Sequence, residues 1–408
     1  MMSNIKEVVF NGGPFQSYWW ADEHEPVHPA IMAELEDDID PDILTKAWEN
    51  TKKVYPLIDL VPDDCDEEVV FIKSEGISRP INSKCVLKLV SEATLKRGVS
   101  LTYYENTVTL SIYHSIVDEK GLIEIFKTLM NFYISAYAHK PVDAKNVMME
   151  QSRRPEDYFV QNTMISPENY IPKPIKLYRD IREIFNDSKI ANSEDNAVTV
   201  GEMDIPLCEY DKFCKDNGAS ADEMMIYVMA KTIYDMYPDE RKKLSFGVMT
   251  DFRKTFGVSD TIAPCSKKMP LVLSYDEING VDMREALEII SKTRAYQKSE
   301  DYIKSHIVLE NTYSVLNIRN ACMSVNFCGE FDIEDKTSYI QNITMTDYSL
   351  RSVFMIRLND TVKVSFQYGN ATADYMSAVA KTLNKFGVKA EITVNAYGIA
   401  SESESPIV

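Results

Sequence analysis

The sequence predicts an α/β protein made of two sandwich lobes, each with a mixed β-sheet. Strand-like and helix-like segments are mixed in both halves of the chain, and several strands come in hairpin-like pairs. Strands and helices do not alternate one by one, which disfavours a doubly wound parallel sheet. With 408 residues, 45% of them hydrophobic, the chain can bury one large core or two ordinary ones.

The segment between the two halves is polar and broken by prolines. It contains SRRPEDY, SPENYIPKPIK and NDSKIANSEDN. This composition is typical of a long surface crossing between lobes. We therefore predict an N-terminal lobe over 1–150, a crossing segment over 151–197 and a C-terminal lobe over 198–408.

The first half begins with a helix and continues with a hairpin. Asp40-Pro41 offers an N-cap and a first-turn proline, and the apolar spacing that follows predicts a helix over about 41–54. The runs EEVVFIK and SKCVLKLV are strand-like, and GVSLTYYENTVTLSIYH predicts a β-hairpin that turns at Glu105-Asn106. Helical periodicity then begins after Asp118 and ends near 139–141.

The second half mixes strands and helices in the same way. It starts with a strand in NAVTVGEMDIP, a helix around CEYDKFCKDN and a turn at Gly218-Ala219-Ser220. A second apolar helix in ADEMMIYVMAKTIYDMY and a strand in KLSFGVMTDFR follow. The later segments predict a helix at MREALEIISKTRAY, strands at ACMSVNF, RSVFMIRL and VKVSFQYG, and a closing helix at TADYMSAVAKTLNKFG.

Charge and composition disfavour several classes of partner. The formal net charge of -19 repels polyanions, so neither nucleic acid nor an anionic membrane is an expected partner. The sequence shows no export signal and no run of about 20 apolar residues. Its seven cysteines form no C-x-x-C pair, which fits a reducing compartment. We expect a cytoplasmic monomer.

Common enzyme motifs give no support to other chemistries. G-x-S-x-G, G-x-G-x-x-G, P-loop and H-E-x-x-H patterns do not occur in the sequence. His24 and His28 have the spacing of metal ligands on a helix, but the prolines at 26 and 29 break such a helix. We therefore expect no metal site and no tightly bound cofactor.

His114 lies at the end of the second hairpin strand. It falls on the same face as Val108, Leu110 and Ile112 by strand alternation, so we predict that it points inward. Such a histidine is more often a core residue than a catalytic one, and Asp118 would suit a helix N-cap. The alternative is a general base in a single tautomer, with Asp118 pinning the backbone by pairing with a cation. The short H-x-x-x-D spacing does not decide between them.

Five segments, spread over most of the chain, carry a family resemblance. DPDILTKAWENTKKVYPLIDLVP resembles a first helix with its closing turn, and SIYHSIVDEKGLIEIFKTLM occupies the place of an H-H-x-x-x-D-G signature. The helix pair that opens the family's second lobe resembles LCEYDKFCKDNGASADEMMIYVMAKTIYDMY. A strand that ends in arginine resembles KLSFGVMTDFRKTFG, and a later strand that crosses between lobes resembles SVNFCGEF. The superfamily includes chloramphenicol acetyltransferase, alcohol acetyltransferases, wax ester synthases and the condensation domains of nonribosomal peptide synthetases.

This resemblance implies two chloramphenicol-acetyltransferase-like lobes around a central tunnel, and an acyltransferase that uses a coenzyme A or carrier-protein thioester. The acceptor would be an alcohol or an amine, and the donor would bind as a co-substrate. His114 would be the general base, Asp118 a structural carboxylate and Arg253 its ion-pair partner. Ser324 or Asn326 would supply the oxyanion donor. From the residues alone, Arg253 is as readily a solvated strand end.

Two departures from the signature leave an alternative function open. Tyr113 stands at the first histidine, and Glu119 stands where most members carry glycine, with Gly121 two places later. A carboxylate there would repel an anionic acyl donor, so a catalytically inactive binding or scaffold protein is the alternative. The basic runs Arg241-Lys242-Lys243 and Lys267-Lys268 are candidates for the donor's phosphates, although such runs are more often solvated turns.

Overall fold

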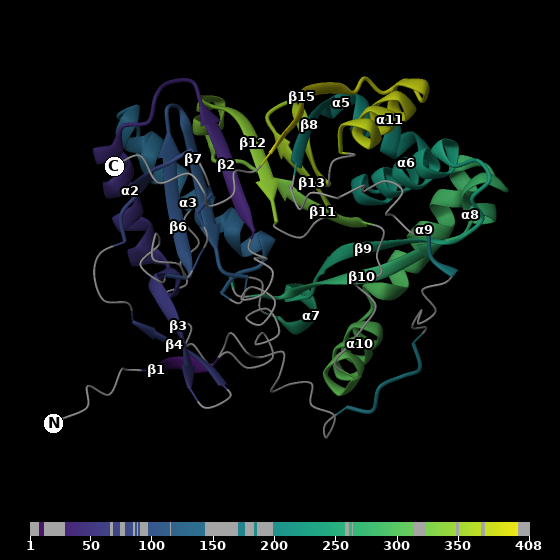
Figure 1. Cartoon of the computed structure of the whole chain (residues 1–408), viewed down its shortest axis with the longest axis horizontal. Helices are drawn as coiled ribbons and strands as arrows, with labels where there is room; N and C mark the ends of the chain where they lie inside the picture. Colours follow the sequence, from purple (N-terminus) through teal and green to yellow (C-terminus); the bar gives the residue numbers. More distant parts are fainter. Residues whose placement is uncertain are drawn as a thin grey trace.

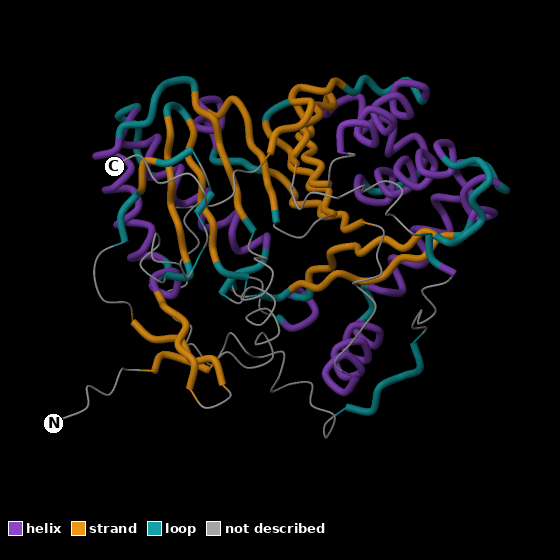
Figure 2. Tube along the Cα trace, in the orientation of Figure 1, coloured by secondary structure: helices purple, strands orange, loops and turns teal. Residues whose placement is uncertain are grey.

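The computed structural model describes two lobes, each built on a mixed α/β arrangement (Figures 1 and 2). The predicted fold class is therefore confirmed, whereas the central tunnel stays a prediction. The described residues are 8–11, 29–65, 68–73, 78–84, 86–87, 89, 97–114, 116–142, 170–175, 183–185, 199–257, 261–262, 264–313, 323–347, 351–368 and 372–398. Most of the predicted crossing segment lies outside these ranges, and the domain boundaries stay predictions.

A five-stranded sheet with the order β12-β2-β7-β6-β5 and two long helices form the first lobe. The predicted hairpin is confirmed as β6 and β7, which pair antiparallel across a turn where Glu105 has a φ of 51°. The helices begin at the predicted caps, Asp40 and Asp118. The elements are β2 Ala30–Leu35, α2 Pro41–Val54, β5 Ile81–Asn82, β6 Val99–Tyr104, β7 Thr107–Ile112, α3 Glu119–Tyr137 and β12 Ile340–Thr346.

A separate three-stranded sheet lies beside the first lobe, near the described N-terminal residues (Figure 1). Its order is β1-β4-β3, and its strands are β1 Val8–Asn11, β3 Leu60–Cys65 and β4 Glu68–Lys73. The strand predicted at EEVVFIK is confirmed as β4. The run SKCVLKLV lies only partly within the described residues. Its described residues, including Val86 and Leu87, belong to no strand, so the strand predicted there is wrong for them.

A seven-stranded sheet with the order β10-β9-β11-β13-β14-β8-β15 forms the second lobe. Helices cover its outer face (Figures 1 and 2). The strands are β8 Thr199–Pro206, β9 Leu244–Asp251, β10 Ser266–Leu273, β11 Met323–Glu330, β13 Arg351–Leu358, β14 Thr361–Tyr368 and β15 Glu391–Gly398. The helices are α5 Leu207–Asn217, α6 Ala221–Met236, α7 Arg253–Phe256, α8 Tyr275–Asn279, α9 Met283–Gln297, α10 Glu300–Tyr313 and α11 Thr372–Lys385, with short 3-10 turns at Pro56–Asp59 and Glu334–Tyr339.

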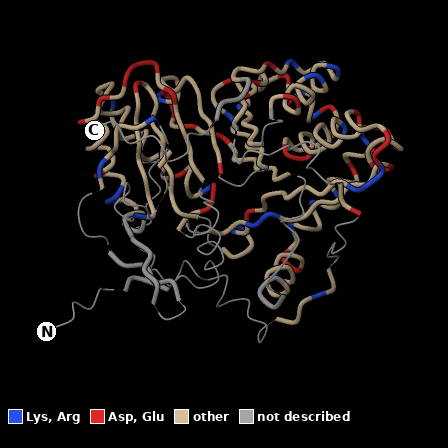
Figure 3. Tube along the Cα trace, in the orientation of Figure 1, with Lys and Arg blue, Asp and Glu red and all other residues tan. Residues whose placement is uncertain are grey.

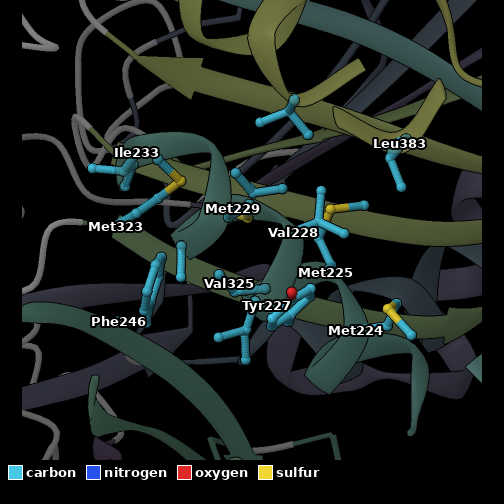
Figure 4. Close-up of a cluster of buried hydrophobic side chains, with 14 of the residues drawn as sticks. Met224, Met225, Tyr227, Val228, Met229, Ile233, Phe246, Met323, Val325 and Leu383 are labelled. Atoms are coloured by element: carbon cyan, nitrogen blue, oxygen red, sulfur yellow. The ribbon is translucent and has the colours of Figure 1, made fainter. Parts of the chain in front are cut away.

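Helix α6 is the centre of the second lobe's core. It is buried on nearly all sides because α5, α8, α9, α11 and the sheet surround it. Methionines and aliphatic side chains from α6 meet the outward-facing side of β11 and β9 (Figure 4). Unbranched methionines fill such irregular gaps between many neighbours. The apolar run ADEMMIYVMAKTIYDMY therefore encodes a central helix and not an amphipathic surface helix.

Strand β13 is apolar on both faces because both faces are buried. Val353 and Met355 join the core around α6, whereas Phe354 and Ile356 join the core of the first lobe. That second core also contains residues of α2, α3 and the five-stranded sheet. Helix α3 consequently lies between the two sheets, with one side on β2 and β7 and another on β11.

The strand that crosses between the lobes is β12. The sequence prediction placed this role on SVNFCGEF, and that prediction is wrong, because SVNFCGEF forms most of β11 between β9 and β13. Strand β12 instead pairs antiparallel with β2 and lies over β13 and β14. Glu202 on β8 accepts hydrogen bonds from Asn342 Nδ2 and Thr344 Oγ1, both at 2.8 Å, and so fixes β12 to the second sheet.

At Gly121, in the first turn of α3, the backbones of the two halves of the chain approach each other closely. A Cβ atom at this position would lie 2.1 Å from the carbonyl oxygen of Ile262, a residue of the second lobe that is fully buried. Backbone contact of this kind requires glycine, because the backbone atoms of both lobes would have to move to admit a methyl group.

We expect Gly121→Ala to lower the free energy of unfolding by about 2 kcal/mol, since overpacking costs exceed the helix-propensity gain of about 1 kcal/mol. Chemical denaturation followed by circular dichroism measures the change. Lys120→Ala, at the neighbouring exposed position, is the control and should change stability by less than about 1 kcal/mol. Equal stability of Gly121→Ala and wild type would show that the close approach is not a constraint.

Candidate active site

A tight turn between β7 and α3 positions both residues of the H-x-x-x-D motif. The backbone N–H groups of Ile116 and Val117 donate to the carbonyl of Tyr113, at 2.9 and 3.3 Å. Asp118 then caps α3 by accepting from Gly121 N at 2.9 Å. The motif therefore joins the end of a strand to the start of a helix, as the sequence predicts.

The Asp118 carboxylate holds the two lobes together. It is fully buried, and its five hydrogen bonds come from both lobes. Arg253 donates to it through Nη1 and Nη2 at 2.9 and 2.7 Å, and Cys265 N and Ser266 Oγ each donate at 2.9 Å. Burial alone would raise the pKa of Asp118, but the Arg253 charge and these donors hold it below its usual range.

Arg253 is buried, with 1% of its surface exposed, so its interpretation as a solvated strand end is wrong. It begins the short helix α7, its Nε donates to Thr261 O at 2.8 Å, and its Nη1 also donates to Asp251 Oδ1 at 3.1 Å. The bidentate pairing with Asp118 matches the fork of the guanidinium to the two carboxylate oxygens. This buried pair compensates both charges, and the loss of either partner would leave the other uncompensated.

His114 is buried, with 7% exposed, in agreement with the inward direction predicted from strand alternation. Its Nδ1 lies 3.0 Å from the carbonyl oxygen of Val117. Because a carbonyl only accepts, Nδ1 carries the proton in this contact, and the neutral ring keeps its lone pair on Nε2. Nε2 lies 4.0 Å from Glu119 Oε1.

Glu119 is the charged neighbour of His114 and is buried, with 4% exposed. Neither carboxylate oxygen has a hydrogen-bond partner among the described residues. Burial raises the pKa of Glu119, although His114 and Lys268 oppose that rise. Lys268, on β10, lies 3.3 Å from Asp347 Oδ2. Burial lowers the pKa of Lys268, but the charges of Asp347 and Glu119 outweigh burial and raise it.

The oxyanion candidates lie on β11, on the face that points away from the α6 core. Met323 and Val325 occupy the opposite face, so Ser324 and Asn326 alternate with them. Asn326 is 1% exposed, and neither of its side-chain polar atoms has a hydrogen-bond partner within the described part of the chain. Burial and the nearby Glu119 charge raise the pKa of the Cys328 thiol on this strand well above its usual range. Helix α3, whose first residue is Glu119, contacts β11.

The two basic runs form no common site. Arg241 stacks on the ring of Tyr275 at 4.0 Å, and Lys243 pairs with Glu183 at 2.9 Å. Lys268 is a partly buried strand residue, with 16% of its side chain exposed, and not a solvated turn, because β10 pairs along its whole length with β9. Figure 3 shows acidic and basic residues interspersed over both lobes. The donor's phosphates therefore have no assigned partner.

Metal and membrane features are absent from the described ranges listed above. Within those ranges, no three His, Cys, Asp or Glu side chains are arranged to hold a metal ion. His24 and His28 lie outside the described residues. None of the helices described is both long and apolar enough to cross a bilayer.

Sequence reasoning missed the ion pair between Lys268 and Asp347. Asp347 follows β12, is 2% exposed and accepts from Ser352 Oγ at 3.0 and 3.1 Å. Its backbone N–H donates to Gln367 Oε1 at 2.9 Å. The strand pattern SKKMPLVL carried a signal for β10, since its second half is apolar, but no local signal connects it to a residue 79 positions later.

Solved structures share this fold over almost the whole chain. Polyketide synthase associated protein 5 from Mycobacterium tuberculosis has a TM-score of 0.65 at 12% identity, covering 93% of this chain and 97% of that one. TRI101 of F. sporotrichioides, complexed with coenzyme A and T-2, has a TM-score of 0.63 at 10% identity, covering 90% and 97%. The first condensation domain of the calcium-dependent antibiotic synthetase, with a substrate analogue, has a TM-score of 0.60 at 12% identity, covering 93% and 96%.

These matches confirm the fold that the family resemblance predicted. At 10–12% identity they show the two-lobed fold alone, and the activity of this chain remains to be argued from its own residues. No family model and no curated protein matches the chain.

We expect Asp118→Ala and Arg253→Ala each to lower the free energy of unfolding by about 3–5 kcal/mol, because each leaves one buried charge without its partner. Urea denaturation measures both. The control is Lys120→Ala, which breaks an exposed pair with Asp251 and should cost less than about 1 kcal/mol. Wild-type stability in both variants would contradict the ion pair.

Glu119→Gln should make the protein relatively more stable as the pH rises. The raised pKa of Glu119 means that its folded form binds its proton more tightly than its unfolded form. The free energy of unfolding of wild type therefore falls relative to that of the variant as the pH rises. The fall begins at about pH 4.3, the ordinary pKa of glutamate in the unfolded chain, and ends above the raised pKa of the folded protein. Denaturation at pH 5 and pH 8 measures this gap, with Glu124→Gln on the same helix as control. A gap that does not grow with pH would contradict the burial of an ionisable carboxylate here.

Proposed function

We propose that the protein is an acyltransferase that moves an acyl group from a coenzyme A or carrier-protein thioester to an alcohol or amine. The observation that carries this proposal is the buried His114, whose Nδ1 donates to Val117 O, so that Nε2 is the nitrogen of the neutral ring that can accept a proton. A general base needs that arrangement. The fold shared with TRI101, which was solved with coenzyme A, supports the thioester donor.

His114 Nε2 would take the proton of the acceptor as the acceptor attacks the thioester carbonyl carbon. The resulting tetrahedral intermediate carries a negative oxygen, which Asn326 Nδ2 or Ser324 Oγ would stabilise by donating a hydrogen bond. Asn326 is the stronger candidate because its buried amide has no other described partner. Collapse of the intermediate breaks the carbon–sulfur bond, and the thiolate takes the proton from His114.

Asp118 and Arg253 would act as positioning residues. They touch neither donor nor acceptor in this scheme, but their ion pair fixes the turn that carries His114 to β10 and α7 of the opposite lobe. Small displacements of a general base lower its rate sharply, because proton transfer needs hydrogen-bond distance. In this proposal His114 is the catalytic residue, and the ion pair between Asp118 and Arg253 holds it in position.

A binding or scaffold protein without transfer is the second candidate. The observation that favours it is Glu119, whose buried carboxylate lies 4.0 Å from His114 Nε2. A negative charge at this place disfavours an anionic donor and competes for the histidine. The same experiment separates the two candidates, because a binding protein would take up thioesters and leave them unchanged.

We expect His114→Ala to abolish acyl transfer and to leave folding and thioester binding intact. A mixture of primary alcohols and amines is incubated with acetyl-coenzyme A or a long-chain acyl-coenzyme A, and the products are read by mass spectrometry. Thermal shift with the same thioesters reports binding, since a ligand at 100 times its Kd adds about 2.7 kcal/mol.

The control for this prediction is His139→Ala, at an exposed histidine just after α3. Transfer by His114→Ala at the wild-type rate would refute the general base. Thioester binding by wild type without any product would support the binding protein instead.

A further inference from the structure

The carboxylate of Glu119 lies beside the nitrogen of His114 that accepts a proton. Nδ1 of His114 donates to Val117 O at 3.0 Å, so a proton from another group goes to Nε2. Glu119 Oε1 lies 4.0 Å from this Nε2, and the two side chains are only 9% and 5% exposed. That separation is too long for a hydrogen bond, but it is an ion-pair distance once the ring is protonated. The carboxylate therefore acts on the ring through its charge, and solvent screens it little.

Lys268 is the cation that acts on the same pair from the other lobe. It lies on β10, and its Nζ is 3.3 Å from Asp347 Oδ2. Burial raises the pKa of Glu119, and the charges of His114 and Lys268 oppose that rise. Burial lowers the pKa of Lys268, but the charges of Asp347 and Glu119 outweigh it. Glu119 therefore has an ionisable neighbour in each lobe.

The other charged groups that the structure describes around this pair have partners of their own. Asp118 and Arg253 compensate each other at 2.7 Å. Lys120 on α3 pairs with Asp251 at 3.0 Å, and both are about half exposed, so solvent screens them. The Cys328 thiol on β11 is neutral at ordinary pH, since burial raises its pKa well above the usual range. The charges that act most directly on the histidine are therefore those of the neighbouring glutamate and lysine.

A carboxylate and a lysine have opposite effects on an imidazole near them. The negative charge favours the imidazolium, and an opposite charge within about 4–6 Å shifts a pKa by about 1–3 units. The positive charge disfavours the uptake of a proton by either member of the pair. Because the pKa of Glu119 is raised towards the ordinary range of histidine, the carboxylate and the imidazole titrate together. The titrating unit is then the pair and not the ring alone.

We propose that His114 and Glu119 act as one base that takes up a single proton from the acceptor, and that Lys268 keeps this base unprotonated before the reaction. This rests on the proposed acyl transfer. The carboxylate stabilises the imidazolium that forms during attack, and the lysine opposes proton uptake from solvent. Glu119 and Lys268 act through His114, so they are positioning residues in this scheme.

The pair returns to its starting state after each transfer. As the acceptor oxygen or nitrogen forms its bond to the thioester carbonyl carbon, its proton moves to His114 Nε2. The imidazolium then faces the Glu119 carboxylate at ion-pair distance. When the carbon–sulfur bond breaks, the thiolate leaves with the electron pair of that bond and takes the proton from Nε2. Glu119 thus supports transfer and does not block it.

Histidine titration by NMR tests the pair without any transfer. The chain has five histidines, and the ring signal of His114 is assigned by its loss in His114→Ala. We expect its titration midpoint in Glu119→Gln to lie at least about one pH unit below that of wild type, because the neutral amide no longer favours the imidazolium. Glu124→Gln makes the same change elsewhere on α3 and should leave the midpoint unchanged. Equal midpoints in wild type and Glu119→Gln overturn the pair.

Lys268→Met should move the same midpoint to higher pH, because the charge that opposes proton uptake is gone. The double variant Lys268→Met/Asp347→Asn takes its place where loss of the lysine alone unfolds the protein, since it also removes the partner carboxylate. Circular dichroism reports folding. A midpoint that stays in place or falls in the folded variant overturns the role of Lys268.

The pH dependence of kcat/KM connects the pair to the proposed transfer, with acetyl-coenzyme A as donor and 1-hexanol as acceptor. The acid limb should follow the NMR midpoint, to lower pH in Glu119→Gln and to higher pH in Lys268→Met. The plateau kcat of Glu119→Gln should fall about threefold or more, since a weaker base takes the proton less readily. Glu124→Gln should keep the wild-type profile.

The outcomes distinguish the paired base from the proposed transfer. A midpoint that depends on Glu119, without product from the mixture of alcohols and amines, keeps the pair and overturns transfer. Transfer whose acid limb is the same in wild type and Glu119→Gln overturns the pair and leaves transfer standing.

Discussion

The buried carboxylate of Asp118 is the interaction on which the rest of the site depends. Its five hydrogen bonds come from the first turn of its own helix and from Arg253, Cys265 and Ser266 in the other lobe. A fully buried carboxylate is tolerable only with this many donors and a paired cation. Through this contact the turn that carries His114 is fixed against a strand and a helix that lie far away in sequence.

The same contact explains the sequence around it. Glycine stands at 121 because the helix backbone must approach Ile262 of the opposite lobe, so the glycine of the motif serves lobe contact in this chain. Position 119, where most resembling proteins have glycine, then accommodates a glutamate beside the histidine. The Asp118 carboxylate thus holds the two lobes together, and the Glu119 carboxylate lies beside His114.

Local structure was predictable where it depends on neighbouring residues. The caps at Asp40 and Asp118 and the turn at Glu105 follow from short patterns, and so did the inward direction of His114. The pairing of Arg253 with Asp118 was predicted only from the family resemblance, because the charged residues next to Arg253 in the sequence suggest a solvated position. The pairing of Lys268 with Asp347 could not be recognised, since the end of a different strand brings Asp347 beside it.

Strand order was the least predictable part of the fold. SVNFCGEF alternates as a buried strand should, but alternation does not name the neighbours of a strand, and the crossing role belongs to β12. Hydrogen bonds from Asn342 and Thr344 to Glu202 decide that placement, and they join residues about 140 positions apart.

The crossing strand has a consequence for any attempt to divide the protein. Without β12, the edge of β2 would present a row of unpaired backbone N–H and C=O groups. A fragment ending before residue 340 would carry such an edge and tend to pair with other copies of itself. The remaining fragment would carry β12 without its sheet. The seven-stranded sheet comes entirely from residues 199–398, whereas the five-stranded sheet is complete only once residue 346 has been synthesised.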